Sequence, residues 1–336
     1  MAIAIGAIIA FPLAARSIER RSSAATLALF ASIMILALPI VGLAPHMLVL
    51  ILVLLVFGFG NGGMDVSMNA QGIEVERFVG GSIINSLHGF FSLGAVIGAA
   101  VGAAAAQVNI SPLAHFLGVT ALGLAVLWRV GGWLIHEQPR ERKAQDGRTF
   151  RLPPRSLWAL GALALCTSAG EGAMADWSGL YLHAYLGASS GFAALGYAAF
   201  SVAMLTGRFT GDALVRRFGA PLLVRRGGLL AALGLGIAVI INQPLIMLLG
   251  FAAVGLGLSV VYPLVFSAAG NHPSLPSGRA VASVATVGYG GFLAGPPLLG
   301  WLAQATSLRV VMGLIVLLAT LIVVLAGATR SARLAR

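Results

Sequence analysis

The chain has 336 residues, of which 59% are hydrophobic and 9% are charged, and it carries a formal net charge of +11. This composition excludes a water-soluble globular protein, because so few polar side chains cannot cover its surface. The charge does not indicate nucleic-acid binding either, because the basic residues lie in short segments between apolar stretches. The chain is therefore expected to lie in a lipid bilayer.

Apolar stretches of about 20 residues, long enough to cross about 30 Å of hydrocarbon as helices, follow one another along the chain. A shorter apolar piece over residues 1–14 precedes them and lacks the basic start of a secretory signal. Counting this piece, the sequence predicts an all-α integral membrane protein with about eleven membrane segments. The full spans are expected roughly at 24–43, 47–73, 84–107, 112–135, 156–184, 190–212, 222–241, 244–268, 279–304 and 308–328.

Glycines recur in the second half of the chain at a constant offset. Gly58, Gly60, Gly94 and Gly98 are matched 197 residues later by Gly255, Gly257, Gly291 and Gly295. A constant offset across two spans and the loop between them indicates a duplicated membrane bundle. On the span at 84–107 a glycine occurs at every fourth residue, at Gly94, Gly98 and Gly102. This spacing predicts a smooth helix face on which a neighbouring helix packs closely.

The longest polar stretch, 136–155, contains prolines, a glycine and alternating charges, and it is expected to be a cytoplasmic linker. It divides an N-terminal bundle, 1–135, from a C-terminal bundle of six helices, 156–336. Because the second bundle begins near Ser156, the repeat offset places the start of the first about 40 residues before Met1. The first bundle is thus expected to lack its first helix. Either the natural product begins upstream of Met1 or the chain is a truncated paralogue, and a complete chain is expected to have about twelve helices.

Basic residues occupy alternate loops, and the intervening connections near residues 45, 109, 188, 243 and 306 carry no Lys, Arg, Asp or Glu. Since loops rich in Lys and Arg stay on the cytoplasmic side, this alternation predicts a multi-pass protein of the inner or plasma membrane with a cytoplasmic C-terminus. The basic positions are Arg16, Arg20, Arg21, Arg77, those within 140–155, Arg216, Arg217, Arg225, Arg226, Arg279, Arg330, Arg333 and Arg336.

The span at 47–73 carries a polar stripe. Asn61, Asp65 and Asn69 recur at i, i+4 and i+8, so they lie on one helix face, which is expected to border a wet cavity. A charge in mid-membrane costs at least about 2.5 kcal/mol, and burial disfavours the ionised carboxyl. Asp65 is therefore the principal candidate for a proton site. The alternative is that it only holds a neighbouring helix by hydrogen bonds.

The next span carries a second stripe, in which Asn85 and Ser92 lie at i−3 and i+4 from His88. His88 is a candidate extension of the proton path, because imidazole exchanges protons near neutral pH. A neutral, hydrogen-bonding histidine is an equally favoured interpretation.

The span at 156–184 contains two further acids. Glu171 lies between Gly170 and Gly172, which weaken the helix and can expose backbone groups to a ligand. It is a candidate for solute binding or proton relay, against the alternative of an interhelical hydrogen bond that fixes a kink. Asp176 lies about 140° further around the helix and is expected to be structural.

Aromatic side chains suit the binding of sugars, and they equally suit an interfacial belt, which is favoured for Tyr185. Trp177, Tyr181 and Tyr185 share one helix face, and the repeat offset superposes Tyr262 on Asp65. The expected solute-binding residues are Asn61, Asn69, Asn85, Trp177, Tyr181 and Tyr262.

The sequence Gly207-Arg208-Phe209-Thr210-Gly211-Asp212, followed by Arg216-Arg217-Phe218-Gly219, resembles the signature loop of the major facilitator superfamily. The resemblance implies a two-bundle helical fold and a loop that brackets the cytoplasmic gate. Arg208, Asp212, Arg216 and Arg217 are the gating candidates, with an ion pair expected between Asp212 and Arg208 or Arg216. A solvated loop that serves only topology is the alternative. The equivalent stretch at 12–21 keeps Arg20 and Arg21 but has Ala15 where the family usually has Asp.

The stretch Gly63-Met64-Asp65-Val66-Ser67-Met68-Asn69 resembles the acid-x-x-x-Asn of the fourth helix in the fucose-permease branch of this superfamily. That resemblance implies that Asp65 takes part in coupling proton and sugar movement. The stretch from Glu171 to Trp177 is similar to the Glu-Gly-Ala-x-x-Asp-Trp of uncharacterised bacterial members. The acid that the branch uses on its first helix is absent from this chain.

The expected function is secondary active transport of a small polar, sugar-like solute by alternating access, with proton symport through Asp65, Glu171 and His88. The alternatives are proton-driven efflux of amphipathic compounds and a non-transporting membrane sensor or scaffold. No phosphate-binding Gly loop, hydrolase motif or Cys/His metal spacing occurs, so neither an ATP-driven pump nor an enzyme is expected. The expected partners are the solute, protons and the bilayer, without nucleic acid, cofactor or metal, and a monomer is the expected state.

Overall fold

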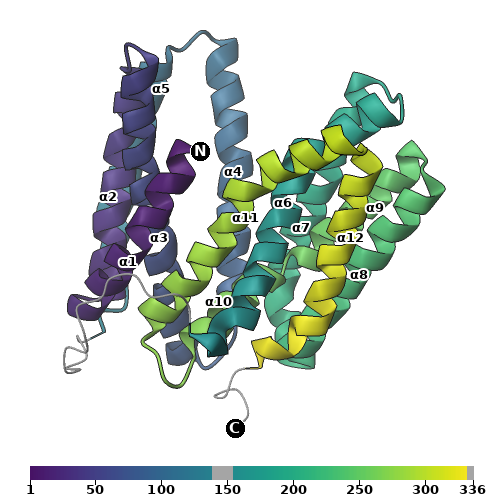
Figure 1. Cartoon of the computed structure of the whole chain (residues 1–336). Coiled ribbons are helices and arrows are strands. Elements are labelled where there is room, and N and C mark those ends of the chain that lie inside the picture. The colour runs from purple at the N-terminus through teal and green to yellow at the C-terminus, as the bar shows by residue number, and fades with distance from the viewer. Residues whose placement is uncertain (138–153, 331–336) are drawn as a thin grey trace.

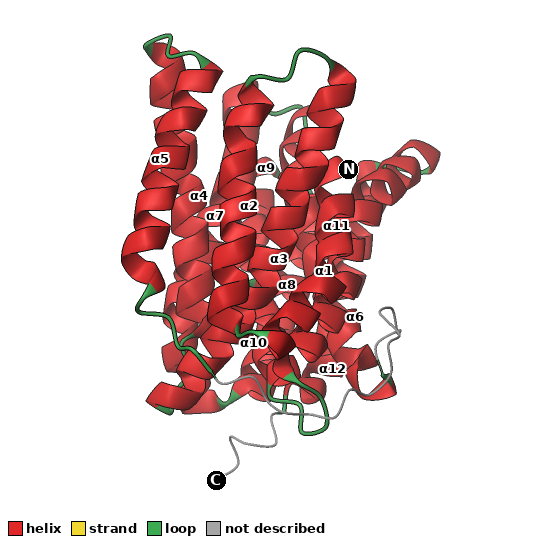
Figure 2. Ribbon diagram, turned by 90° about the vertical axis from the view of Figure 1, so that its left-hand side faces the viewer, coloured by secondary structure: helices red, strands yellow, loops and turns green. Residues whose placement is uncertain are grey.

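The computed structural model describes residues 1–137 and 154–330, and every regular element in these ranges is helical (Figure 2). The helices before residue 138 are α1 (Ala2–Arg20), α2 (Ser23–Gly42), α3 (Met47–Val79), α4 (Ile84–Gln107) and α5 (Pro112–Gly131). The later elements are η1 (Arg155–Leu157), α6 (Trp158–Leu180), η2 (Tyr181–Tyr185), α7 (Ser190–Phe218), α8 (Ala220–Ile241), α9 (Pro244–Leu258), α10 (Val261–Gly270), α11 (Ser277–Ala305), α12 (Leu308–Leu325) and η3 (Ala326–Thr329).

The chain is an all-α integral membrane protein. Within the described ranges, nine helical stretches are long and apolar enough to cross a membrane by length and composition. The connections alternate between two ends of the molecule (Figure 1). One end, here called the arginine-rich end, holds the α1–α2, α3–α4, α7–α8 and α10–α11 connections with Arg21, Arg77, Arg216, Arg217 and Arg279 at or near them.

Several expected boundaries are corrected by the structure. The first apolar piece is a full helix, α1, which continues to Arg20 instead of ending at Ala14. Helix α3 extends beyond residue 73 to Val79, where Gly80 takes the left-handed conformation (φ 69°) that ends many helices. The span expected at 244–268 is divided into α9 and α10, because Pro263 has no N–H to bond the carbonyl of Ser259.

The interruption expected at Gly170 and Gly172 is not formed. Helix α6 continues through both glycines to Leu180, and the irregular segment is instead the π-helical η2 at Tyr181–Tyr185. Most of the expected linker, residues 138–153, lies outside the described residues.

The first glycine repeat is explained by close helix approach. A Cβ added to Gly58 would lie 2.1 Å from the carbonyl oxygen of Ile3, and one added to Gly255 would lie 2.1 Å from that of Phe200. Ile3 and Phe200 are themselves 197 residues apart. The repeat therefore encodes one packing arrangement twice, α3 on α1 and α9 on α7.

The second glycine repeat has a different outcome in its two copies. Gly291 packs on Ser168 of α6, whereas a Cβ added to its counterpart Gly94 would meet no atom within 4 Å. The same open space is found at Gly98, at its counterpart Gly295 and at Gly102. The close packing expected on this face of α4 is thus not made by the described residues, because none of their helices lies against it.

Helices α1–α5 are here called the first helix group and α6–α12 the second (Figure 1). Within the first, α1, α2, α3 and α5 pack on one another, as do α6, α7, α8, α9, α11 and α12 within the second. The two groups meet mainly where α1 contacts α11 and where α4 contacts α7. Large, fully buried side chains, including Phe11 and Phe266, lie at these junctions and surround the polar groups described next.

Candidate functional site

A hydrogen-bonded chain centred on Asp65 connects three helices. Tyr289 of α11 donates its hydroxyl to Oδ2 of Asp65 on α3 (3.2 Å), and Nδ2 of Asn69 donates to Oδ1 of the same carboxylate (3.1 Å). Oδ1 of Asn69 lies 2.9 Å from Nε2 of His88 on α4. Since the Asn69 amide nitrogen is used on Asp65, its oxygen is the acceptor, and Nε2 of His88 carries the proton in this arrangement.

The helical spacing of α3 accounts for the geometry around Asp65. Residues four apart lie on one helix face, so Asn61 and Asn69 flank the carboxylate, and Asn61 also interacts with Tyr289. Among the described residues no salt bridge reaches Asp65, so its neighbours are neutral donors. Phe11 packs edge-on against Tyr289, with ring centroids 4.9 Å apart, which fixes the tyrosine beside the acid.

A second polar group lies on the neighbouring helices. Arg208 of α7 donates Nη1 to the Ser92 hydroxyl of α4 and Nη2 to Oε1 of Glu171 on α6, the latter at 3.4 Å. Tyr262 of α10 lies close enough to interact electrostatically with both Asp65 and Glu171. The two clusters are therefore neighbours. Nε of Arg208 and the hydroxyl of Tyr262 are buried and have no hydrogen-bond partner among the described residues.

Asp212 binds the N-terminus of α4, contrary to the expected pairing with Arg208 or Arg216. It lies inside α7 rather than in a loop, is 5% exposed, and accepts from the backbone N–H groups of Asn85 (3.2 Å) and Ser86 (2.8 Å). The side chains of Asn85 (2.9 Å) and Ser82 (3.0 Å) donate to it as well. The free N–H groups of a helix N-terminus are a strong alternative to an arginine for a buried carboxylate.

The predicted gating arginines have separate partners. Arg208 lies with Glu171, while Arg216 donates to the carbonyl of Ser82 at 3.2 Å. Arg217 is exposed, with its guanidinium carbon 5.3 Å from the ring centroid of Phe218. Only Arg216 of these joins Asp212 at the start of α4.

Other contacts at the arginine-rich end were not singled out from the sequence. Glu76 accepts from the N–H groups of Ile83 (3.0 Å) and Ile84 (3.1 Å) and from the hydroxyl of Ser267 on α10 (2.9 Å). Arg77 donates to the last carbonyl of α10, that of Gly270, at 2.9 Å. The signal in the sequence is an acid and an arginine just before a Gly-Gly turn; Arg77 was expected only to set topology, and Glu76 was not singled out.

Glu19 of α1 and Arg279 of α11 form a further contact across the two helix groups, with Nε and Nη2 of the arginine 2.5 and 2.8 Å from the two carboxylate oxygens. From the sequence, Arg279 was expected only to set topology, and Glu19 carried no local pattern that singled it out.

Three predicted solute-binding residues lie apart from the Asp65 cluster. Asn85 is fully buried and is engaged with Asp212. Tyr181 is also fully buried and donates its hydroxyl to Oδ1 of Asn242 at 2.7 Å, near the α8–α9 connection. Trp177 points into a separate pocket.

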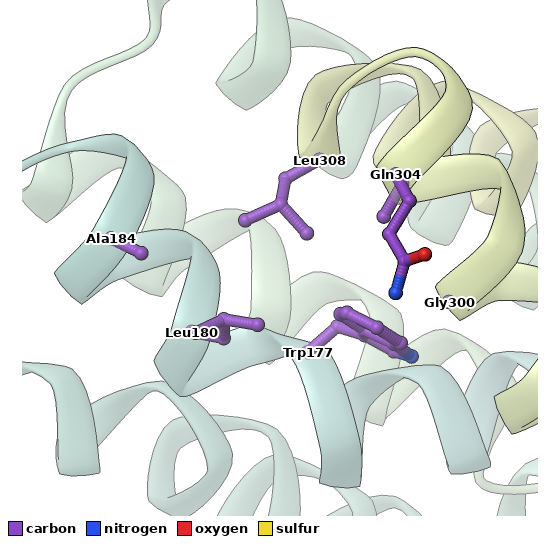
Figure 3. Close-up of a pocket in the computed structure, with 7 residues that line it drawn as sticks. Trp177, Leu180, Ala184, Gly300, Gln304 and Leu308 are labelled. Atoms are coloured by element: carbon purple, nitrogen blue, oxygen red, sulfur yellow. The ribbon is translucent and has the colours of Figure 1, made fainter.

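This pocket, of about 290 Å³, lies between the outer parts of α6, α11 and α12 (Figure 3). The Gln304 side chain lies over the Trp177 ring, whose Nε1 is buried without a partner. The remaining lining residues are Leu180, Ala184, Gly300, Ala303 and Leu308, so the surface is mainly apolar.

Comparison with known proteins gives consistent similarities. The sequence model of the protein family described as the Major Facilitator Superfamily matches residues 1–290 of this chain. An uncharacterised MFS-type transporter of Yersinia pestis is 34% identical over 318 residues, which cover 95% of this chain and 82% of that protein. The structure of the fucose:proton symporter FucP of E. coli has a TM-score of 0.78 at 16% identity, covering 98% of this chain and 89% of that one. The proton:xylose symporter XylE has a TM-score of 0.73 at 14% identity, with 96% and 83% covered.

Proposed function

Because the chain belongs to the major facilitator superfamily, we propose that it is a secondary active transporter that carries a small polar solute together with protons. The observation that carries this proposal is the chain from Tyr289 through Asp65 and Asn69 to His88, which crosses from one helix group to the other. A transporter of this kind needs a group whose protonation is linked to the contact between its two halves.

Asp65 has the properties of such a group. A carboxylate held only by neutral donors in mid-membrane loses hydration without gaining a countercharge, so proton binding stabilises it there. Tyr289 belongs to the second helix group and Asp65 to the first. Their hydrogen bond is therefore made or broken as the groups move, which links proton occupancy to conformation.

The other predicted residues take supporting roles in this proposal. His88 relays protons through Asn69, and Glu171 exchanges a second proton beside Arg208. Asn61, Asn69 and Tyr262 bind the solute, since they surround Asp65 and carry donors and acceptors. FucP and XylE are proton symporters of fucose and xylose, which supports a sugar-like solute as the first class to test.

We further propose that the arginine-rich end faces the cytoplasm and is closed in this conformation. The positive-inside bias supports the orientation. The contacts of Asp212 with α4, of Arg216 with Ser82 before α4, of Arg77 with α10, and of Glu19 with Arg279 support the closure. Each of them joins elements of the two helix groups. Alternating access then requires these contacts to break.

The decisive experiment measures external pH in a weakly buffered suspension of cells that express the protein, after pulses of sugars and of cationic amphiphiles. The sugars tested include sugar acids, and whichever of these compounds is carried is expected to raise external pH. Asp65→Asn is expected to abolish the rise while leaving insertion intact. Asp176→Asn is the matched control, because Asp176 is an exposed acid on α6 outside the cluster.

Other results would replace the proposal. A rise in external pH on the amphiphile pulses alone would favour proton-driven efflux, because each exported molecule is exchanged for a proton taken from the medium. The apolar pocket at Trp177 would then become the first place to seek the substrate. Full expression with no solute-linked pH change would favour a sensor or scaffold.

A further inference from the structure

We propose that the transported solute carries a carboxylate, which binds between Arg208 and Tyr262. This inference rests on the proposed transport function and names the substrate class of the same site. A sugar acid, rather than a neutral sugar, is the expected chemistry.

Arg208 is a buried cation whose present partners do not saturate it. The residue is 8% exposed, and its Nη2 is 3.4 Å from Glu171, longer than the roughly 2.7–2.9 Å of a close arginine–carboxylate hydrogen bond. Only one nitrogen contacts that acid, whereas a guanidinium can hold a carboxylate through two. Nε is buried and finds no acceptor in the part of the chain that the structure describes, so a donor on the cation is left for another acceptor.

Tyr262 supplies a second free donor in the same neighbourhood. Its hydroxyl is buried and unpaired, and it interacts electrostatically with Glu171, the acid that contacts Arg208. Gly288 faces it, and a Cβ added there would lie 2.8 Å from the tyrosine oxygen. The tyrosine hydroxyl thus occupies the space that a side chain at this position would need. A carboxylate has two acceptor oxygens and no donor, which complements one guanidinium N–H and one O–H.

The charges around this position favour an anion that enters with a proton. The ionisable groups facing it are Asp65 of α3, His88 of α4, Glu171 of α6, Tyr262 of α10 and Tyr289 of α11, with Asp212 one turn along α7. Arg208 is the one buried arginine among the described residues. An incoming carboxylate competes with Glu171 for it, and the like charges repel. Protonation of Glu171 relieves that repulsion, so anion and proton bind together.

The experiment uses purified protein in proteoliposomes that contain a pH-sensitive dye, with membrane current recorded in parallel. The probes are matched pairs, galactose with galacturonate and glucose with gluconate. One proton entering with each monoanion acidifies the interior without net current, whereas a proton entering with a neutral sugar acidifies it with current. We expect galacturonate or gluconate to acidify the interior without net current, and we expect neither acidification nor current with galactose and glucose.

Substitutions of the two proposed binding residues test whether the carboxylate binds to Arg208 and Tyr262. Arg208→Gln is expected to weaken carboxylate affinity at least about 30-fold, because a charged partner is lost from a buried pair. Tyr262→Phe, which removes one oxygen and no charge, is expected to weaken it about tenfold and guards against misfolding of the arginine variant. Arg309→Gln is the control, since Arg309 is exposed and donates to the carbonyl of Val239 far from the cluster.

A binding readout separates this inference from the proposed function. The rise in Tm that each probe produces is measured for the detergent-solubilised protein at constant ionic strength. Carboxylates that raise the Tm of the natural protein but not of Arg208→Gln support the inference even if no proton moves. Current and acidification with neutral sugars alone overturn the inference and leave the proposed function intact. Absence of a Tm rise with every carboxylate also overturns it.

Discussion

Asn69 connects the proton-binding candidate with the histidine by using both ends of one amide. Its nitrogen donates to Asp65 and its oxygen accepts from His88, so neither buried group depends on water. Buried polar groups of this kind are costly once a partner is removed, because the stranded atom keeps its desolvation penalty. Asn69 is therefore expected to serve stability as well as proton transfer.

Replacing Asn69 by alanine tests this role. Asn69→Ala leaves Nε2 of His88 and one oxygen of Asp65 without their present partner and is expected to lower the free energy of unfolding by about 1–3 kcal/mol. Thermal unfolding in detergent measures the change. Thr320→Ala on α12 is the control, because its exposed hydroxyl bonds only the carbonyl of Val316. Equal Tm losses in the two variants would contradict a structural role for Asn69.

Among the residues of the candidate site, those that share one helix were predictable from the sequence, and the contacts between helices were not. The stripe of Asn61, Asp65 and Asn69 follows from the 3.6-residue period, so its shared face was predictable. The hydrogen bond from Tyr289 and the contact of Arg208 with Glu171 were not, because each joins helices whose relative placement no local pattern specifies.

At the scale of elements, the N-terminus of α4 is held by two carboxylates from different helices. Glu76 takes the N–H groups of Ile83 and Ile84, and Asp212 takes those of Asn85 and Ser86. These are the amides that no carbonyl within the helix can satisfy, and the helix dipole adds to the attraction. This contact was not predictable from the positions of charged residues, because the partner of Asp212 is a helix end and has no charged side chain.

Asp212→Asn is expected to loosen this end of α4. The amide keeps one acceptor but loses the charge, which costs about 1–2 kcal/mol at a buried helix N-terminus. Hydrogen exchange at residues 83–86 is expected to become about tenfold faster, since local opening follows the lost free energy. The matched control is Asp176→Asn, an exposed acid on α6. Unchanged exchange at 83–86 would show that Asp212 does not hold the helix.

At the scale of the whole molecule, the two contacts between the helix groups are related by the repeat but differ in chemistry. Arg208 lies 197 residues after Phe11, and Tyr289 lies 197 residues after Ser92. The contact of Arg208 with Ser92 on the α4–α7 side therefore corresponds to the contact of Phe11 with Tyr289 on the α1–α11 side. The duplicated backbone arrangement was therefore predictable from the glycine repeat. The sequence did not predict that a polar contact in one copy is replaced by an aromatic contact in the other. The α4–α7 side holds buried charges, and the α1–α11 side holds aromatic packing.

The rim of the molecule holds a second pair of contacts related by the repeat, and here the ion pair is on the α1–α11 side. At the same offset, Arg216 corresponds to Glu19 and Ser82 corresponds to Arg279, so the Arg216–Ser82 contact is the counterpart of the Glu19–Arg279 ion pair. The side chains of Glu19 and Arg279 are 26% and 48% exposed, so water screens their attraction. A double-mutant cycle with Glu19→Gln and Arg279→Gln is expected to give a coupling energy of about 0.5–1 kcal/mol in thermal or chemical unfolding.

This comparison predicts which contact controls opening at the arginine-rich end. Asp212→Asn is expected to speed hydrogen exchange on both sides of that end, at residues 83–86 and at the first turn of α11. Glu19→Gln is expected to change exchange at the first turn of α11 by less than about fivefold, in line with its small coupling energy. Equal effects of the two variants on both turns would mean that the two sides open as one unit. A larger effect of Glu19→Gln would place the main restraint on the α1–α11 side, despite its exposure to water.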